Sequence, residues 1–141
     1  MVKHDISAEA ILELIQTETT GKGGIFTIKS IKTGKEYSYK INRSLFKNKW
    51  YSHIFFEAGY MDFFYLGMYS NNQLIKKGQV NTMPSALAIV FILNQLEKGN
   101  LTFINEKTKF YHLGKCIKCG LPLTDSNSIE AGLGPHCMKM I

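Results

Sequence analysis

The cysteines of this chain are the residues whose type and spacing could do chemistry. There are three of them, and all lie towards the end of the chain, at Cys116, Cys119 and Cys137. Two thiols separated by two residues can face one point when the backbone turns tightly, and Gly120 favours such a turn. Pro135 predicts a short helix that would direct the thiol of Cys137 to the same point. This spacing predicts a metal site, and zinc suits thiolate ligands.

An odd number of cysteines does not close into a complete disulfide framework, which indicates a reducing compartment. The alternative use of Cys116 and Cys119 is a redox pair, as in thioredoxin-like motifs. A redox pair normally opens a helix after a strand, whereas Gly120 and then Pro122 follow this pair. We therefore favour metal binding.

The fourth ligand that a tetrahedral zinc site needs is predicted to be a histidine. His112 lies four residues before Cys116, and His136 lies immediately before Cys137. Adjacent residues point in different directions from a helix or a strand, so we expect His112 to ligate, with His136 as the alternative. Three thiolates and one imidazole leave no position open for water, so the predicted zinc is structural rather than catalytic.

The pattern around these residues also resembles a known domain family. From His112 to Cys137 it reads His-x3-Cys-x2-Cys-Gly, then Leu-Thr-Asp-x2-Ser-Ile at residues 123–129, then Gly-x-Gly-Pro-x-Cys. This is similar to a family of unknown function that is common in small bacteriophage and prophage proteins. The resemblance covers about the last fifth of the chain. It implies a compact zinc-bound module in which the three cysteines are ligands and the position of His136 is variable, and it implies no chemistry.

The positive charge of the chain is concentrated in one segment. The formal net charge is +6, yet residues 22–49 hold eight basic residues and a single acid, Glu36. The basic residues are Lys22, Lys29, Lys32, Lys35, Lys40, Arg43, Lys47 and Lys49. Such an excess favours a polyanion as partner, because each neutralised phosphate releases condensed counterions. The aromatic residues that lie between or beside these lysines could stack on bases, namely Tyr37, Tyr39, Phe46, Trp50 and Tyr51. The alternatives are core packing for the aromatics and a merely solvated sheet face for the lysines.

Periodicity and turn residues predict an α+β fold, with a mainly antiparallel sheet packed on one long buried helix. The predicted strands cover residues 25–31, 36–41, 50–57, 63–70, 101–104 and 109–113. A short helix is predicted over residues 8–18, and the long one starts at Pro84 and ends before Gly99.

We expect three parts along the chain. Residues 1–20 are predicted to be an N-terminal helical arm, joined by a flexible link that runs to Gly24. Residues 21–111 are predicted to be the α+β domain with the basic hairpin, and residues 112–141 the zinc-binding module packed on it.

The sequence has no catalytic constellation of a paired nucleophile and base, so we predict no catalytic residues and a protein that is not an enzyme. It has no signal segment and no apolar run that could span a bilayer, which predicts a cytoplasmic protein of a bacterial host cell without a membrane partner.

The favoured function is that of a phage-type accessory protein that binds nucleic acid, or a nucleic-acid-bound host complex, through the basic 22–49 hairpin. The alternative is a non-enzymatic inhibitor in counter-defence or host take-over, which would bind a host defence protein. A metal-dependent enzyme is the more distant alternative, and an open coordination position would favour it.

Overall fold

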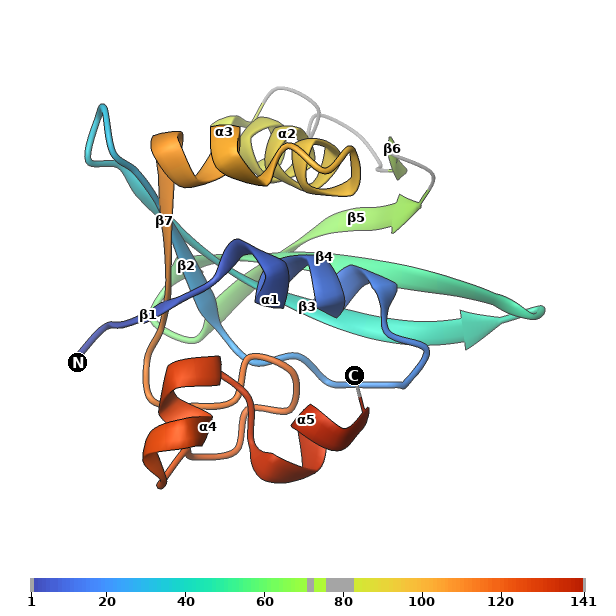
Figure 1. Ribbon diagram of the computed structural model, residues 1–141. Coiled ribbons are helices and arrows are strands. Elements are labelled where there is room, and N and C mark those ends of the chain that lie inside the picture. Colours follow the sequence, from blue (N-terminus) through green and yellow to red (C-terminus); the bar gives the residue numbers. More distant parts are fainter. Residues whose placement is uncertain (1, 71–72, 76–82, 141) are drawn as a thin grey trace.

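The structure is a computed structural model that describes residues 2–70, 73–75 and 83–140. These residues form a seven-stranded antiparallel sheet in the order β1-β7-β2-β3-β4-β5-β6. The strands are β1 His4–Ile6, β2 Phe26–Ser30, β3 Glu36–Phe46, β4 Lys49–Gly59, β5 Asp62–Ser70, β6 Gln73–Ile75 and β7 Thr108–His112. With its helices this is the predicted α+β fold with a mainly antiparallel sheet (Figure 1).

The helices fall into two groups. In Figure 1, α1 Ala8–Gln16 lies in front of the sheet, α2 Pro84–Glu97 and α3 Leu101–Lys107 lie above it, and α4 Ser126–Ala131 and α5 Pro135–Met140 lie below it. The core between the sheet and the first three helices holds the fully buried side chains Ile11, Leu14, Phe26, Tyr39, Ile54, Leu66, Ile89, Leu93, Leu96 and Ile104. None of these helices is long and apolar enough to cross a membrane.

Two tyrosines fix α2 across the sheet. The hydroxyl of Tyr39 on β3 donates to the carbonyl of Ser85 at the start of the helix, at 2.7 Å. The hydroxyl of Tyr69 on β5 donates to the side chain of Asn94 near its end, at 2.6 Å. The predicted long helix is therefore present and packs on the sheet, but its outer side, which includes Phe91, is half exposed.

The N-terminal residues contribute one strand to the sheet and one helix to the core. Ile6 on β1 pairs with Phe110 on β7, so the segment forms one edge of the sheet. Ser7 caps α1, because its side chain accepts a hydrogen bond from the backbone N–H of Ala10, and Ile11 is fully buried in the core. A helix that looked amphipathic from the sequence is thus one of the central core elements, while the division of the chain at residues 20 and 111 stays a prediction.

Two local predictions differ from the structure. Residues 101–104 begin a helix, α3, rather than a strand, because Leu101 and Ile104 are three residues apart and face the core from one side of a helix. A short apolar run fits either kind of element, so its periodicity alone did not decide. Strand β3 also extends to Phe46 and forms a long hairpin with β4, whose turn places Lys47 and Asn48 in the left-handed backbone region.

The two faces of the sheet differ. Alternate residues of β3, such as Tyr39 and Ile41, face the helices and are buried, whereas Lys40 and Asn42 point to the opposite face. We call this opposite side of β2 to β5 the open face, since the core residues of these strands lie on the helix side. Strand register places the side chains of Lys29, Lys40, Lys49, His53, Phe55, Glu57, Phe63 and Tyr65 on it.

Candidate metal centre

The structure brings the three cysteines together. The Sγ atoms of Cys116, Cys119 and Cys137 all lie within 4.8 Å of one another, and none of these cysteines forms a disulfide. A tetrahedral zinc ion with Zn–S bonds of about 2.3 Å holds its sulfur ligands about 3.8 Å apart, so small side-chain movements would bring all three into bonding distance. The donor set therefore fits a thiophilic metal ion such as zinc.

The first two thiols are placed by a tight backbone turn. The N–H of Gly120 donates to the carbonyl of Cys116 at 2.8 Å, and the N–H of Cys116 donates to the carbonyl of Leu121 at 2.8 Å. Gly120 has a φ of 83°, which residues with a side chain rarely adopt. The turn closes the loop from Cys116 to Cys119, and the glycine directly after the second cysteine allows it.

The third thiol is placed by two short helices. Asp125 caps α4 by accepting a hydrogen bond from the N–H of Ser128 at 3.1 Å, and Gly132 ends this helix in the left-handed conformation. The carbonyl of Gly132 then accepts from the N–H of Ile117 at 2.9 Å, which joins the end of α4 to the cysteine turn. Helix α5 follows directly and carries Cys137. The aspartate, serine and glycine of the sequence pattern thus have structural roles.

The structure does not bring His112 into the cysteine group. His112 is fully buried, and its Nε2 lies 2.5 Å from the carbonyl oxygen of Ile129. Its Nδ1 accepts a hydrogen bond from the N–H of Gly114 at 3.0 Å, so both ring nitrogens have backbone partners. The ring also stacks on His4, with centroids 4.9 Å apart. Burial lowers the pKa of His112, the hydrogen bond to Ile129 raises it, and His4 lowers it further, with a net lowering that favours the neutral ring.

The alternative ligand, His136, is also outside the group. It is exposed on α5, next to Cys137, and adjacent residues project in different directions from a helix. Within the part of the chain that the structure describes, no histidine or carboxylate joins the three thiols. Three of the four predicted ligands therefore converge, and the identity of the fourth stays a prediction.

The thiols influence one another's protonation. The pKa of Cys137 is raised to about 12. The causes are burial, hydrogen bonds with the thiols of Cys119 and Cys116, and the negative charge of these thiols when they are ionised. For Cys116 burial also raises the pKa, but the backbone groups of Gly134, Cys119 and Lys118 lower it by more, so the net shift is downwards. Three adjacent thiolates repel each other, and a bound cation would remove that repulsion while displacing the thiol protons.

Backbone hydrogen bonds join residues 113–140, which we call the cysteine module, to the sheet. The N–H of Gly23 donates to the carbonyl of Lys118 at 2.9 Å, and the N–H of Gly24 donates to the carbonyl of Ile117 at 2.8 Å. The side chain of Lys118 is buried and donates to the hydroxyl of Thr19. The residues that the sequence predicted to be a flexible link are therefore a hydrogen-bonded contact between the module and the segment that leads into β2.

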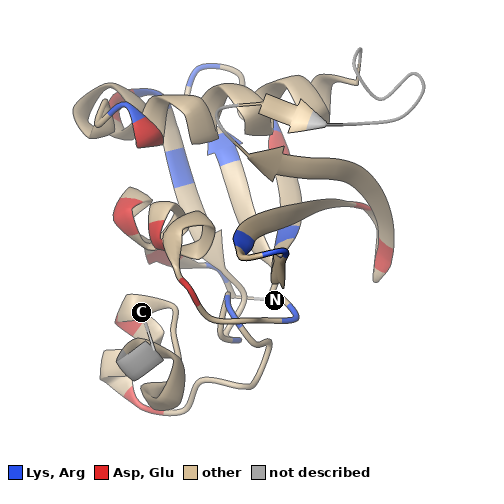
Figure 2. Cartoon of the chain, turned by 90° about the vertical axis from the view of Figure 1, so that its right-hand side faces the viewer, with Lys and Arg blue, Asp and Glu red and all other residues tan. Residues whose placement is uncertain are grey.

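The basic residues of the 22–49 segment are distributed over three places. Lys29, Lys40 and Lys49 lie on the open face, and the others except Arg43 lie in the flanking loops and turns, at Lys22, Lys32, Lys35 and Lys47. In Figure 2, Lys and Arg recur along the strands, while several of the Asp and Glu residues lie on helices. The basic residues of the segment therefore do not all lie on one face.

Arg43 is the exception among the predicted basic surface residues. It points to the helix side, is 9 % exposed, and donates from Nε to the carbonyl of Thr17 at 2.9 Å. Its Nη1 donates to the hydroxyl of Ser52 at 3.2 Å, and its guanidinium lies 5.5 Å from the ring centroid of Trp50. Arg43 thus has a role in packing and is not presented to an external anion.

Sequence reasoning missed the aromatic residues that accompany Lys40. Phe55, Phe63 and Tyr65 lie beside it on the open face, although the aromatics considered from the sequence were mostly those within residues 37–51. Tyr39, one of that earlier set, is buried in the core, in agreement with the packing alternative. The alternation of residues 50–57 could have predicted that Phe55 lies on the same face as Lys40. The face of Tyr65 could not be predicted in this way, because a bulge in β5 interrupts the alternation of that strand.

Comparison with known proteins gives one family match. The model of a family of unknown function, DUF6011, matches residues 106–140, which include all three cysteines. No curated protein and no solved structure is significantly similar to the chain. The C-terminal part of the protein is thus similar to an uncharacterised family, and it holds a group of cysteines compatible with a metal ion.

Proposed function

We propose that this protein is a non-enzymatic accessory protein that binds single-stranded nucleic acid on the open face of its sheet and is stabilised by zinc in its C-terminal module. The observation that supports the binding surface best is the aromatic–lysine cluster, which we define as Lys40, Phe55, Phe63 and Tyr65. A positively charged surface with exposed aromatic rings is the combination that binds single strands without strong sequence preference.

The geometry of the aromatic–lysine cluster supports this proposal. The ammonium group of Lys40 lies 4.2 Å from the ring centroid of Phe63 and 5.0 Å from that of Phe55. The rings of Phe55 and Tyr65 are 5.1 Å apart, and Tyr65 is 46 % exposed. A cation held over aromatic rings stays close to the surface on which a base would stack, so it can neutralise the adjacent phosphate.

The charges around the aromatic–lysine cluster also favour an anion. Among the residues that the structure describes, the one ion pair joins Lys3 to Glu36, so no carboxylate lies within ion-pair distance of Lys40. Lys29 and Lys49 share the open face with Glu36 and Glu57, and Lys47 lies at the tip of the β3–β4 hairpin, so the basic groups there outnumber the acidic ones. Each lysine that neutralises a phosphate releases a condensed counterion and adds to the salt dependence of binding.

Zinc would have a structural role in this protein. Its ligands would be Cys116, Cys119 and Cys137, and bound metal would hold the cysteine turn to α5. Structural zinc contributes to folding directly, since the assembled ligand set is absent from the unfolded chain. The module contacts the segment that leads into the sheet through Gly23 and Gly24, so metal would also stabilise this end of the open face.

The metal proposal is tested by elemental analysis of protein purified with a reductant and without a chelator. We expect about one equivalent of zinc per chain, and less than about a tenth of an equivalent in Cys119→Ser. The matched control is Ser126→Ala, which changes a side chain at the start of α4 outside the cysteine group. Wild-type protein with no bound transition metal would overturn the structural-zinc proposal.

The nucleic-acid proposal is tested by fluorescence anisotropy with a labelled single-stranded DNA and RNA, over a series of salt concentrations. We expect Lys40→Gln to reduce the slope of log K against log salt by about 0.7, the contribution of one phosphate contact to single-strand binding. The matched control is Lys98→Gln, an exposed lysine after α2, which should leave the slope unchanged. Absence of binding by the wild type at low salt would refute the proposal.

Affinity purification separates this function from the alternative of a host-protein inhibitor. Under the proposal, host components recovered with the tagged protein are lost after nuclease treatment, because nucleic acid connects them. A specific host protein that stays bound after nuclease treatment and is lost in Lys40→Gln would instead favour the inhibitor.

A further inference from the structure

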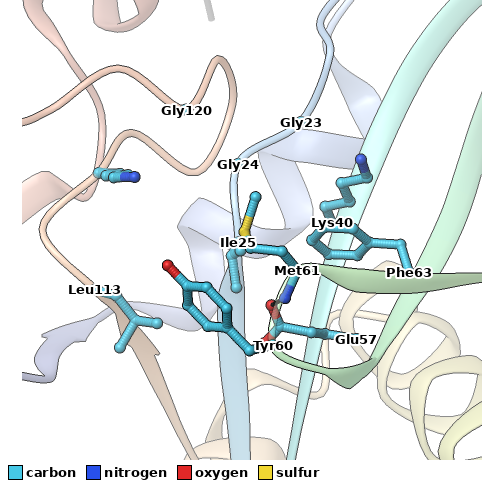
Figure 3. Close-up of a pocket in the computed structure, with 11 residues that line it drawn as sticks. Gly23, Gly24, Ile25, Lys40, Glu57, Tyr60, Met61, Phe63, Leu113 and Gly120 are labelled. Carbon is cyan, nitrogen blue, oxygen red and sulfur yellow. Dashed lines mark hydrogen bonds between the residues drawn. The ribbon is translucent and has the colours of Figure 1, made fainter. Parts of the chain in front are cut away.

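A cavity lies where the open face meets the cysteine module. Its volume is about 200 Å³, and it is lined by the β4–β5 hairpin, by the segment that leads into β2 and by the turn between β7 and the cysteines. Figure 3 shows Tyr60 and Met61 from the hairpin on one side, with Gly120 and Leu113 on the other. The cavity therefore lies between two parts of the chain that are distant in sequence.

The hairpin contributes an exposed aromatic wall. Tyr60 is 84 % exposed and Met61 is 58 % exposed, so both side chains are accessible to a ligand. Met61 has a φ of 56°, and its N–H donates to the carboxylate of Glu57 at 3.1 Å. This hydrogen bond holds the turn, so the Tyr60 ring is presented from a defined backbone. In Figure 3 its hydroxyl points across the cavity towards the module.

The cavity also has charged groups of both signs. Lys40, whose ammonium lies over Phe63, is on the sheet side, and Lys115 is contributed by the module. Glu57 lines it from the hairpin side. An ammonium group can bind a phosphate oxygen, and a carboxylate can accept a hydrogen bond from an amino group.

The module wall is held firmly. Gly23 and Gly24, which line the cavity, are bonded through their N–H groups to the carbonyls of Lys118 and Ile117. Gly120, also a lining residue, closes the turn between two of the cysteines. The shape of this wall therefore depends on the cysteine turn that the metal would stabilise.

We propose that this cavity binds one nucleobase together with its phosphate, an inference that rests on the proposed function. Its volume is below the roughly 300–1,000 Å³ of pockets that enclose drug-sized ligands, so it suits a single ring system. The base stacks on Tyr60 against the apolar side chains of Ile25 and Leu113. Lys115 binds the phosphate, the positive charge of Lys40 attracts the strand, and Glu57 accepts a hydrogen bond from an amino group of the base. The cavity is the position on the open face at which one nucleotide of a single strand is held.

The test compares variants in binding to a short fluorescein-labelled single-stranded DNA at low salt. Tyr60→Ala is expected to weaken binding by about 5- to 150-fold, since base–aromatic stacking contributes about 1–3 kcal/mol. Tyr60→Phe is expected to retain binding, because it keeps the ring. The matched control is Phe91→Ala, which removes an exposed aromatic from α2 and should bind as the wild type does. Thermal unfolding verifies that each variant is folded.

A second arm uses the four mononucleotides as probes and the same DNA with one base replaced by an abasic site. We expect the wild type to bind the abasic strand more weakly than the intact strand. Tyr60→Ala should bind the two strands equally. Wild-type binding that Tyr60→Ala and Lys115→Gln leave unchanged would overturn the cavity as the base site but leave the proposed function standing. Saturable binding of mononucleotides without binding of the strand would support the cavity and refute the proposed function. Binding of neither probe refutes both.

Discussion

A methyl group on Gly24 would lie 1.8 Å from the backbone carbonyl oxygen of Cys116, and no side-chain rotation could remove that overlap. The N–H of the same glycine donates to the carbonyl of Ile117. The backbone before β2 and the backbone of the cysteine turn are therefore in direct contact. The cysteine module and the sheet share a backbone contact at this point, which gives the first prediction.

Gly24→Ala should destabilise the protein by about 3 kcal/mol or more, because relief of the overlap requires the two backbones to separate. It should also reduce zinc retention, since the shifted atom belongs to a cysteine ligand. Chemical denaturation and elemental analysis measure the two effects. Gly59→Ala is the control, because its added methyl group would be 3.9 Å from the nearest atom, an ordinary contact. Equal stability of the two variants would contradict the close contact.

His112→Gln should keep the metal and lose stability. Both ring nitrogens of His112 have backbone partners, so the substitution leaves buried polar groups of Ile129 and Gly114 incompletely bonded and should cost about 2 kcal/mol. Elemental analysis and denaturation separate the two effects. Loss of zinc as complete as in Cys119→Ser would instead identify His112 as the fourth ligand.

His136→Gln tests the other candidate for the fourth metal ligand. The side chain is exposed, so the variant should have the stability of the wild type within about 0.5 kcal/mol. It should also retain its zinc, because His136 lies outside the cysteine group. Zinc loss in this variant alone would show that α5 rotates on metal binding to bring the imidazole to the ion.

Arg43→Gln should reduce stability and leave nucleic-acid affinity unchanged. The substitution removes hydrogen bonds from a buried cation to Thr17 and Ser52, and bonds of this kind contribute about 1.5–3 kcal/mol each. Lys40→Gln should show the opposite pattern, with weaker binding and a stability loss below about 1 kcal/mol, the usual size of an exposed cation–π contact. If Arg43→Gln weakened binding while keeping its stability, Arg43 would belong to the binding surface.

His53 should make stability depend on pH. Its Nε2 lies 2.8 Å from the hydroxyl of Ser44 and its Nδ1 lies 3.0 Å from that of Tyr65. Burial lowers the pKa of His53 below its ordinary value of 6.5, so the unfolded chain takes up the proton first as the pH falls. This histidine therefore destabilises the fold as the pH falls below about 6.5, and has no such effect above it.

The measurement for His53 compares the wild type with His53→Gln by chemical denaturation at about pH 7.5 and about pH 5. The unfolding free energy of the wild type should fall relative to that of the variant at the lower pH. The comparison between two proteins removes the contribution of the thiols, which both share. If the difference in unfolding free energy between the two proteins is the same at both pH values, His53 binds its proton equally well in the folded and unfolded states.

Much of the cysteine group could be predicted because its geometry is local. Two cysteines around a tight turn, a glycine after them and a proline before the third cysteine each restrict the backbone over a few residues. The α+β class was predictable for a similar reason, since periods of two and of 3.6 residues are read within one element. Residues 101–104 were predicted wrongly, as a strand instead of a helix, because so short an apolar run fits both periods.

The sequence by itself determined that Cys116, Cys119 and Cys137 would converge, and that lysines would gather in residues 22–49. Only the tertiary structure decided that Arg43 points into the core, that the nitrogens of His112 bond to backbone groups, and that a cavity forms beside Tyr60. Each of these features depends on segments far apart in the chain. Strand register and the contact of one backbone with another determine which of them meet, and neither is encoded in the spacing of neighbouring residues.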